Sequence, residues 1–164
     1  MPQDLIRKFP DPLLRHVSKP VTQFDSKLEV FAKQLVTVMK NQPGGIGIAA
    51  PQIGVLKRVA IVDVSPKVPN SSLLILINPE IIKSREVIVL REGCMSLPDF
   101  TANVRRFEEI EVKWQDLKGN WQYKIAVSLE ARCIQHEIDH LNGLLFLDRV
   151  STLKSDVFRR KRYL

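Results

Sequence analysis

Two histidines and a glutamate form the most chemically specific pattern in this sequence. His136-Glu137-Ile138-Asp139-His140 is an HExxH motif in a segment whose apolar spacing predicts a buried helix. Residues four apart lie on one helical face, so both imidazoles can bind one metal ion, and Glu137 can touch a water on that metal. A buried, hydrogen-bonded histidine pair without a metal is the alternative, although such a pair repels itself when protonated. The spacing favours a metal site.

A metal held by two histidines needs at least one further ligand. The elongated motif HExxHxxGxxH would place a histidine at position 146, but the residue there is Phe146, which cannot bind a metal. Upstream, Cys94 offers a thiolate, a strong ligand for a borderline metal, and its alternative role is that of a buried structural thiol. Cys133 is the second candidate; it lies one turn before His136, where three ligands on consecutive turns would strain the geometry, and is better suited to a pocket wall.

A stretch rich in glycine and alanine, residues 45–52, is the third candidate for a functional segment. Small residues such as Gly47 leave the backbone uncovered, which suits a strand edge that pairs with an extended peptide. Gln52 ends the stretch with an amide donor. The simpler interpretation is a tight turn between a helix and the next strand.

The elements that must position these residues can be read from periodicity and turn signals. A capping box at Ser26 opens an amphipathic helix that stops at residues 41–45. Strands are predicted at 58–64, 73–78, 86–91, 109–114 and 121–127, with the last two forming an antiparallel hairpin. Ser128 is predicted to cap the helix that carries the HExxH motif and ends near residues 141–143. Because helices and strands do not alternate as βαβ units, the order predicts an α+β fold.

Composition excludes some classes of protein but does not by itself indicate a function. The 164 residues predict one domain, and a net charge of +7 is concentrated in the last sixteen residues, which carry +5. Two cysteines cannot form a disulfide framework, no apolar run is long enough to cross a membrane, and the start does not resemble a secretory signal, so we expect a cytoplasmic protein. We expect a catalytic domain at 1–150 and a basic, helical C-terminal tail at 151–164. That tail leaves open a second class, a basic nucleic-acid or ribosome-associated module.

Taken together and in this order, the three candidate segments resemble those of bacterial-type peptide deformylases. The motifs GxGxAAxQ, EGCxS and HExDH of that family appear at 45–52, 92–96 and 136–140, and the similarity extends through 9–15 and 77–80 to about residue 150. The resemblance implies an α+β fold with antiparallel β-sheets packed around a central helix that bears the HExxH motif, an N-terminal amphipathic helix and a C-terminal basic helix. It also implies hydrolysis of the formyl group of the N-terminal N-formylmethionine of newly synthesised polypeptides, with release of formate.

The resemblance assigns a metal site and a proton-transfer residue. Cys94, His136 and His140 would hold one divalent metal ion with a water in the fourth position. Iron(II) would be the native metal, and zinc, nickel or cobalt could occupy the same site. Glu137 would act as general base and acid while the metal-bound water attacks the formyl carbon.

Binding roles follow from the same resemblance. Gln52 and the backbone N–H of Met95 would form the oxyanion hole, and Ile46 and Gly47 would lie along the substrate backbone. The side chains that would line the pocket for the methionine side chain are those of Leu129 and Cys133. The expected partners are N-formylmethionyl nascent peptides and the ribosome, through the basic tail; no membrane and no sequence-specific nucleic acid are expected.

Two departures and one further hypothesis accompany these assignments. Met95 stands where relatives most often have leucine, with little effect expected because its contact is through the backbone. Thr101 stands where many relatives have an arginine that contacts substrate, so the preference after methionine is open. Glu92, next to the ligand loop, is expected to pair with Arg105 or Arg106. A broad-specificity metalloprotease is a further functional alternative.

Overall fold

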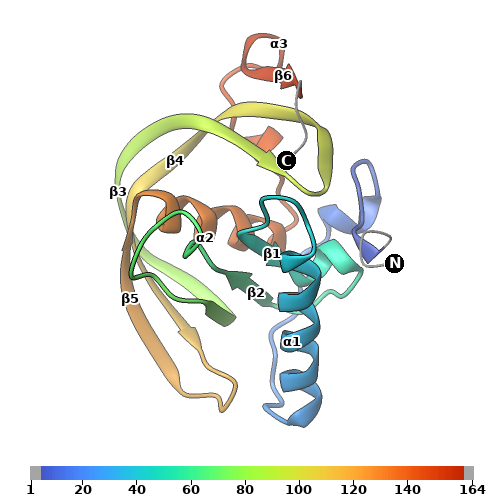
Figure 1. Ribbon diagram of the computed structural model, residues 1–164, viewed down its shortest axis with the longest axis vertical. Helices are drawn as coiled ribbons and strands as arrows, with labels where there is room; N and C mark the ends of the chain where they lie inside the picture. The colour runs from blue at the N-terminus through green and yellow to red at the C-terminus, as the bar shows by residue number, and fades with distance from the viewer. Residues whose placement is uncertain (1–4, 161–164) are drawn as a thin grey trace.

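The computed structural model describes residues 5–160, and within them one antiparallel sheet curls around a central helix (Figure 1). The strands follow the order β1-β2-β3-β4-β5, and β6 pairs with β4. Their bounds are Gly47–Ala49 (β1), Val59–Val62 (β2), Leu74–Cys94 (β3), Leu97–Gln115 (β4), Trp121–Val127 (β5) and Val157–Arg159 (β6). The α+β prediction is confirmed, and β5 has the predicted bounds.

The helices begin close to the predicted residues, but with different caps. They are α1 (Ser26–Lys40), α2 (Ser128–Leu141) and α3 (Leu153–Asp156), with 3-10 turns η2 (Pro12–Arg15), η3 (Ala50–Ile53) and η4 (Phe146–Arg149). Ser26 does not cap α1, because the Asp25 carboxylate accepts the Leu28 N–H at 3.0 Å. Ser128 is the first residue of α2 rather than its cap, and its hydroxyl donates to Glu108.

The segments predicted as separate strands at 73–78 and 86–91 are parts of one long strand, β3. The ladder with β4 accommodates Asn78 and Pro79 as a register shift between Ile77 and Glu80. The hairpin turn between β3 and β4 consists of Met95 and Ser96, with Cys94 opposite Leu97. This turn fixes the position of the cysteine.

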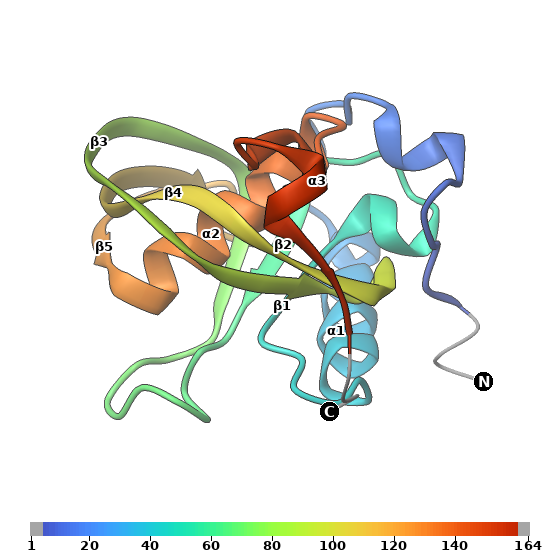
Figure 2. The ribbon, with the colours of Figure 1, turned by 90° about the horizontal axis from the view of Figure 1, so that it is seen from above.

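The prediction of a helical C-terminal tail is wrong for residues 157–159. Helix α3 has a single turn, after which β6 pairs antiparallel with Phe100–Ala102 of β4 (Figure 2). Val157 and Phe158 favour a strand, and Val157 packs against the buried cluster around Val104 and Phe146. The end of the predicted tail, 161–164, lies outside the described residues.

Helix α2 occupies the concave side of the sheet and is buried on both apolar and polar faces. Ala131, Ile134, Ile138 and Leu141 pack against apolar side chains of β2–β5. The other face buries polar side chains, namely those of Glu130, Gln135, Glu137, Asp139 and His140. Because burying polar groups without partners is costly, this face must be hydrogen-bonded, paired or functional.

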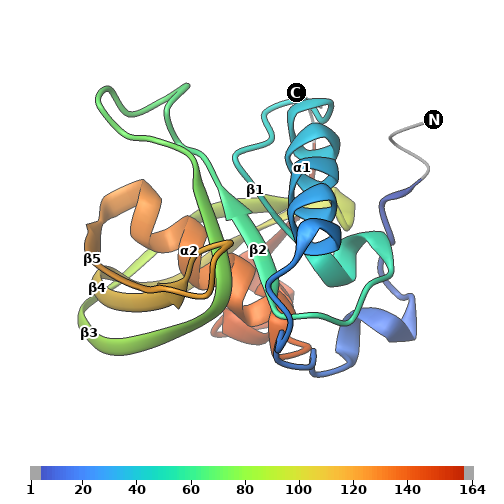
Figure 3. The same cartoon turned by 90° about the horizontal axis from the view of Figure 1, so that it is seen from below.

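Helix α1 packs against β1 and β2 and supports the strand edge next to α2 (Figure 3). Its Leu35, Val38 and Met39 join Ile48 and Ile61 in one buried cluster. Within residues 5–160, no helix is long and apolar enough to cross a membrane.

Candidate metal centre

The structure brings Cys94, at the end of β3, next to the two histidines of α2. One ligand atom from each of Cys94, His136 and His140 lies within 4.8 Å of the other two. The Cys94 Sγ is 3.4 Å from the His140 Nε2. Cys133 is not part of this group, although it is buried on the same helix. The arrangement supplies three donors that suit zinc, iron and similar divalent metals.

Hydrogen bonding around the histidines fits a metal ion. His136 Nδ1 lies 2.9 Å from the Glu92 carboxylate, which leaves its Nε2 for a metal and matches the outer carboxylate that metal-binding histidines usually have. Among the described residues, the Glu137 Oε1 beside the ligands is buried without a hydrogen-bond partner. Unsatisfied buried polar atoms at a cluster of ligands are expected where a further group binds.

The electrostatics of the cluster favour positive charge. Burial opposes protonation of His136, but Cys94, Glu137 and Glu92 together hold its pKa well above the usual value. Burial, with the charges of His136 and Arg106, lowers the pKa of His140 well below the usual value, so this ring is neutral and able to bind a metal. A metal cation bound between these side chains would interact favourably with the same acidic groups, those of Cys94, Glu137 and Glu92.

Glu137 lies beside the ligands rather than among them. Its carboxylate is buried, and burial raises its pKa to about 7, against the opposing charges of His136 and Arg106. A Cβ at Gly47 would lie 2.5 Å from the Glu137 Oε2 and 2.7 Å from the Cys133 Sγ, so β1 can approach α2 this closely only with glycine there. The approach places the backbone of β1 against the carboxylate.

Gln52, in η3, points its amide toward the cysteine. The side-chain oxygen accepts the Ala49 N–H at 2.9 Å, which fixes the orientation of the amide. Its Nε2 lies 3.1 Å from the Ser96 hydroxyl and 3.8 Å from the Cys94 Sγ. The remaining donor capacity of this buried amide is therefore directed into the site.

The other predicted site residues surround a cavity of about 600 Å³. Ile46, Gly47, Met95, Leu129 and Cys133 all line it, together with the Cys94, His136 and Glu137 side chains already described. Cys133 donates to the Ile46 carbonyl at 3.5 Å, and burial raises the pKa of its thiol well above the usual value. Cys133 is therefore a protonated wall residue.

A buried ion-pair network lies behind the histidines. Arg106 donates to both oxygens of Glu92 at 2.9 and 3.1 Å and to Asp139 at 2.6 Å. Asp139 also accepts two hydrogen bonds from Arg149. Of the two arginines considered for Glu92, Arg106 is the partner, and Arg105 is exposed on the opposite face of β4.

The Asp139 and Arg149 part of this network was not predicted from the sequence. A signal was present, since Asp139 falls on a helix predicted to be buried, where a charge needs a partner. The identity of that partner depends on a long-range contact.

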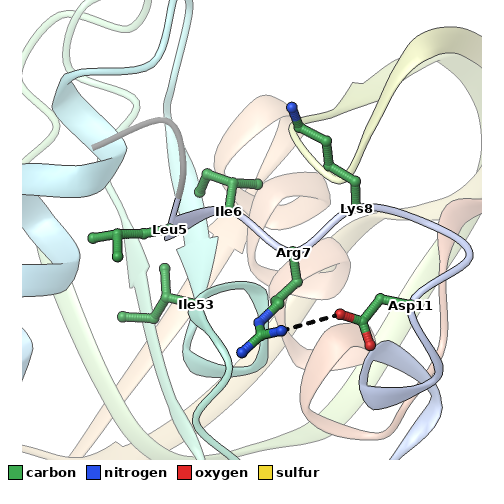
Figure 4. Close-up of a pocket in the computed structure, with 6 residues that line it drawn as sticks. All are labelled: Leu5, Ile6, Arg7, Lys8, Asp11 and Ile53. Carbon is green, nitrogen blue, oxygen red and sulfur yellow. Dashed lines mark hydrogen bonds and ion pairs between the residues drawn. The ribbon is translucent and has the colours of Figure 1, made fainter. Parts of the chain in front are cut away.

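A second cavity, of about 440 Å³, lies between η3 and the N-terminal segment and shares Ile6 and Lys8 with the first (Figure 4). Its lining includes Leu5, Ile53 and the Arg7–Asp11 ion pair of 3.5 Å. Among the described residues, its lining holds no cluster of metal-binding side chains.

A cysteine, two histidines of an HExxH helix and a buried glutamate at one cavity define the class of metal-dependent hydrolases. The family model described as polypeptide deformylase matches residues 4–156, and the chain belongs to this family. It is therefore an enzyme, a hydrolase of the deformylase family.

Individual relatives agree with this assignment. The chain is 44% identical over 156 residues to a peptide deformylase of Thermodesulfovibrio yellowstonii, covering 95% of this chain and 94% of the relative. A peptide deformylase of Mesorhizobium japonicum is 44% identical over 153 residues, with coverages of 93% and 86%.

Solved structures of peptide deformylases also resemble this fold. The peptide deformylase of Synechococcus elongatus in complex with actinonin superimposes with a TM-score of 0.85 at 38% identity, covering 91% of this chain and 81% of that one. The Thermotoga maritima enzyme gives a TM-score of 0.83 at 39% identity, with coverages of 90% and 97%.

Proposed function

We propose that this enzyme hydrolyses the formyl group of the N-formylmethionine at the start of newly synthesised polypeptides and releases formate. The observation that carries the proposal is the convergence of the ligand cluster, the Glu137 carboxylate and the Gln52 amide on one cavity. Family membership supplies the substrate class.

Cys94, His136 and His140 would hold the metal, and we propose iron(II), with zinc, nickel or cobalt suited to the same donors. When bound, a divalent metal lowers the pKa of a coordinated water toward ~7 and polarises the substrate carbonyl. Glu92 keeps His136 oriented through the 2.9 Å hydrogen bond to Nδ1.

Glu137 would move the protons of the reaction. It takes one proton from the attacking water and gives it to the nitrogen of the methionine as the C–N bond breaks, so formate and a free amine leave. A pKa of about 7 suits a group that must both accept and donate a proton near neutrality.

Gln52 and Met95 would stabilise the oxygen of the formyl group as it becomes negative. The Gln52 amide is held by Ala49 and needs no reorganisation to donate, and the Met95 N–H lies in the turn directly after Cys94. Ile46 and Gly47 would pair with the peptide backbone.

The methionine side chain would bind in the remaining part of the cavity. Leu129 and Cys133 line this wall, and the protonated thiol of Cys133 presents a weakly polar surface to a thioether.

The test combines formate release with metal content. The wild type should release formate from formyl-Met-Ala-Ser without cleaving longer peptides internally, whereas internal cleavage would support the metalloprotease alternative. Glu137→Gln should abolish release and retain metal, and Cys94→Ser should lose metal. Cys133→Ser is the matched control and should retain it. Equal metal loss in both cysteine variants would contradict the proposed ligand set.

We also propose that the enzyme works in the cytoplasm near the ribosome, through the basic C-terminal residues. Lys154 is exposed on α3, and Arg162 lies outside the described residues. Lys154→Glu combined with Arg162→Glu should weaken co-sedimentation with ribosomes at moderate salt and leave formate release from a free peptide unchanged. Unchanged co-sedimentation would contradict the proposal.

A further inference from the structure

The charged side chains around the active-site cavity are unevenly distributed. The cavity is lined by five cationic residues, Lys8, Lys67, Arg91, Arg132 and Arg160, and by two acidic ones, Glu92 and Glu137. Both acids belong to the metal centre, and Glu92 is already bound by Arg106. The mouth of the cavity is therefore cationic, which favours an anionic group on the bound molecule.

Two of these cations share one wall, which is built by β3, β4 and β6. Arg91 and Gly93 point to the same face of β3, because they are two residues apart in one strand. Across the ladder, Gly93 pairs with Thr101, which pairs in turn with Phe158 of β6. Strand β6 ends at Arg159, and the backbone N–H of the next residue, Arg160, donates to the Asp99 carbonyl at 2.8 Å.

Arg91 is held in place by neutral groups. Its guanidinium lies 3.8 Å from the centre of the Phe158 ring and donates to the side-chain oxygens of Asn103 and Thr101 at 3.2 and 3.3 Å. Within residues 5–160, no carboxylate forms an ion pair with Arg91, whereas Arg132 is paired with Glu108. The charge of Arg91 is thus oriented but not neutralised by these contacts.

Arg160 reaches the same wall because residue 93 is glycine. A Cβ at Gly93 would overlap the Arg160 Nη2, so the missing side chain provides the space for this guanidinium. Thr101 also lies next to that space. The C-terminal segment therefore contributes to the wall twice, through Arg160, which follows β6, and through the Phe158 ring under Arg91.

We propose that Arg91 and Arg160 form a specificity site that favours formylated peptides with a carboxylate side chain shortly after the methionine. The inference rests on the proposed function. It adds a preference for the residues that follow methionine, which was open because Thr101 stands where many relatives have an arginine. Arg91 is exposed and Arg160 is partly buried, so the two together should contribute roughly fivefold in kcat/KM, or ~1 kcal/mol. The effect should appear in KM rather than kcat, because the contact is remote from the reacting bond.

The test compares formyl-Met-Ala-Xaa-amide peptides in which Xaa is Asp, Asn or Lys, and the same three residues directly after methionine. The amide end ensures that the side chain is the source of the carboxylate. The wild type should prefer Asp over Asn about fivefold and Asp over Lys by more. The preference should shrink at 0.5 M salt, because screening weakens exposed charge pairs.

Arg91→Gln and Arg160→Gln should each reduce the ratio of Asp to Asn while leaving kcat for the Asn peptide unchanged. Arg159→Gln is the matched control, because Arg159 is exposed, adjacent in β6 and absent from the cavity lining; its ratio should equal that of the wild type. Equal kcat/KM for the three peptides at both positions, or a ratio unaffected by both variants, would overturn this inference alone. Absence of formate from every peptide would overturn the proposed function, and this inference with it.

Discussion

Arg106 provides the sharpest test of how the metal centre is supported, because its guanidinium binds two carboxylates and is only 2% exposed. Replacing Arg106 with methionine keeps the apolar stem and leaves Glu92 and Asp139 buried without it. Breaking a buried pair typically costs ~3–5 kcal/mol. In the variant, Glu92 still pairs with His136, and Asp139 still pairs with Arg149. We therefore expect a loss in the free energy of unfolding at the lower end of this range, ~3 kcal/mol.

The measurement is urea unfolding followed by circular dichroism. With a slope of ~2 kcal/mol per molar urea, a loss of ~3 kcal/mol shifts the midpoint down by ~1.5 M. Unfolding should be measured with added metal and with a chelator, since Glu92 orients a proposed ligand and metal binding itself stabilises the folded state.

Arg85 is the matched control for this experiment. It also bridges two carboxylates, Glu109 at 2.8 Å and Glu111 at 2.7 Å, but its side chain is 49% exposed. Arg85→Met should shift the urea midpoint much less than Arg106→Met does, because exposed ion pairs contribute little. Equal midpoint shifts for the Arg106 and Arg85 variants would refute the reasoning that burial, rather than the number of ion pairs, sets the cost.

Three further predictions concern the site and the hairpin. Gln52→Ala should lower kcat by roughly 10²–10³ with metal content unchanged, and a parallel loss of metal would contradict its role as a donor. Gly47→Ala should displace the Glu137 carboxylate and lower kcat by ~10² without unfolding the protein. Kinetics and circular dichroism check this, and an unaltered kcat would exclude a close contact between residue 47 and the Glu137 carboxylate. Asp116 accepts hydrogen bonds from the backbone N–H groups of Asn120 and Lys118, which lower the pKa of its carboxyl group. Its contribution to stability is therefore present above the pKa of the unfolded state and is lost as the pH falls through the pKa of the folded state. The stability difference between wild type and Asp116→Asn should therefore narrow from pH 7 to pH 3 in urea titrations, and a widening difference would contradict this sign.

Much of the local structure could be predicted because it depends on neighbours in sequence. The hairpin with β5 follows from alternating residues around a five-residue turn, and α2 follows from apolar spacing. The sequence predicted two strands where the structure has the single long strand β3, and a register shift in its ladder with β4 accommodates the residues after Ile77. The C-terminal residues were expected to be helical from their charge pattern, and pairing with β4 overrides that preference at Val157.

The sequence by itself determined that His136 and His140 face one point, since helical periodicity alone fixes side chains four residues apart. From the sequence, Cys94 could only be ranked above Cys133 as the third metal ligand. The tertiary structure decided this, because the register of β3 against β4 and the packing of β4 against α2 place the Cys94 Sγ beside the His140 ring. A second long-range pairing, of β6 with β4, brings Arg160 to the cavity, and no local pattern encodes this contact between strands.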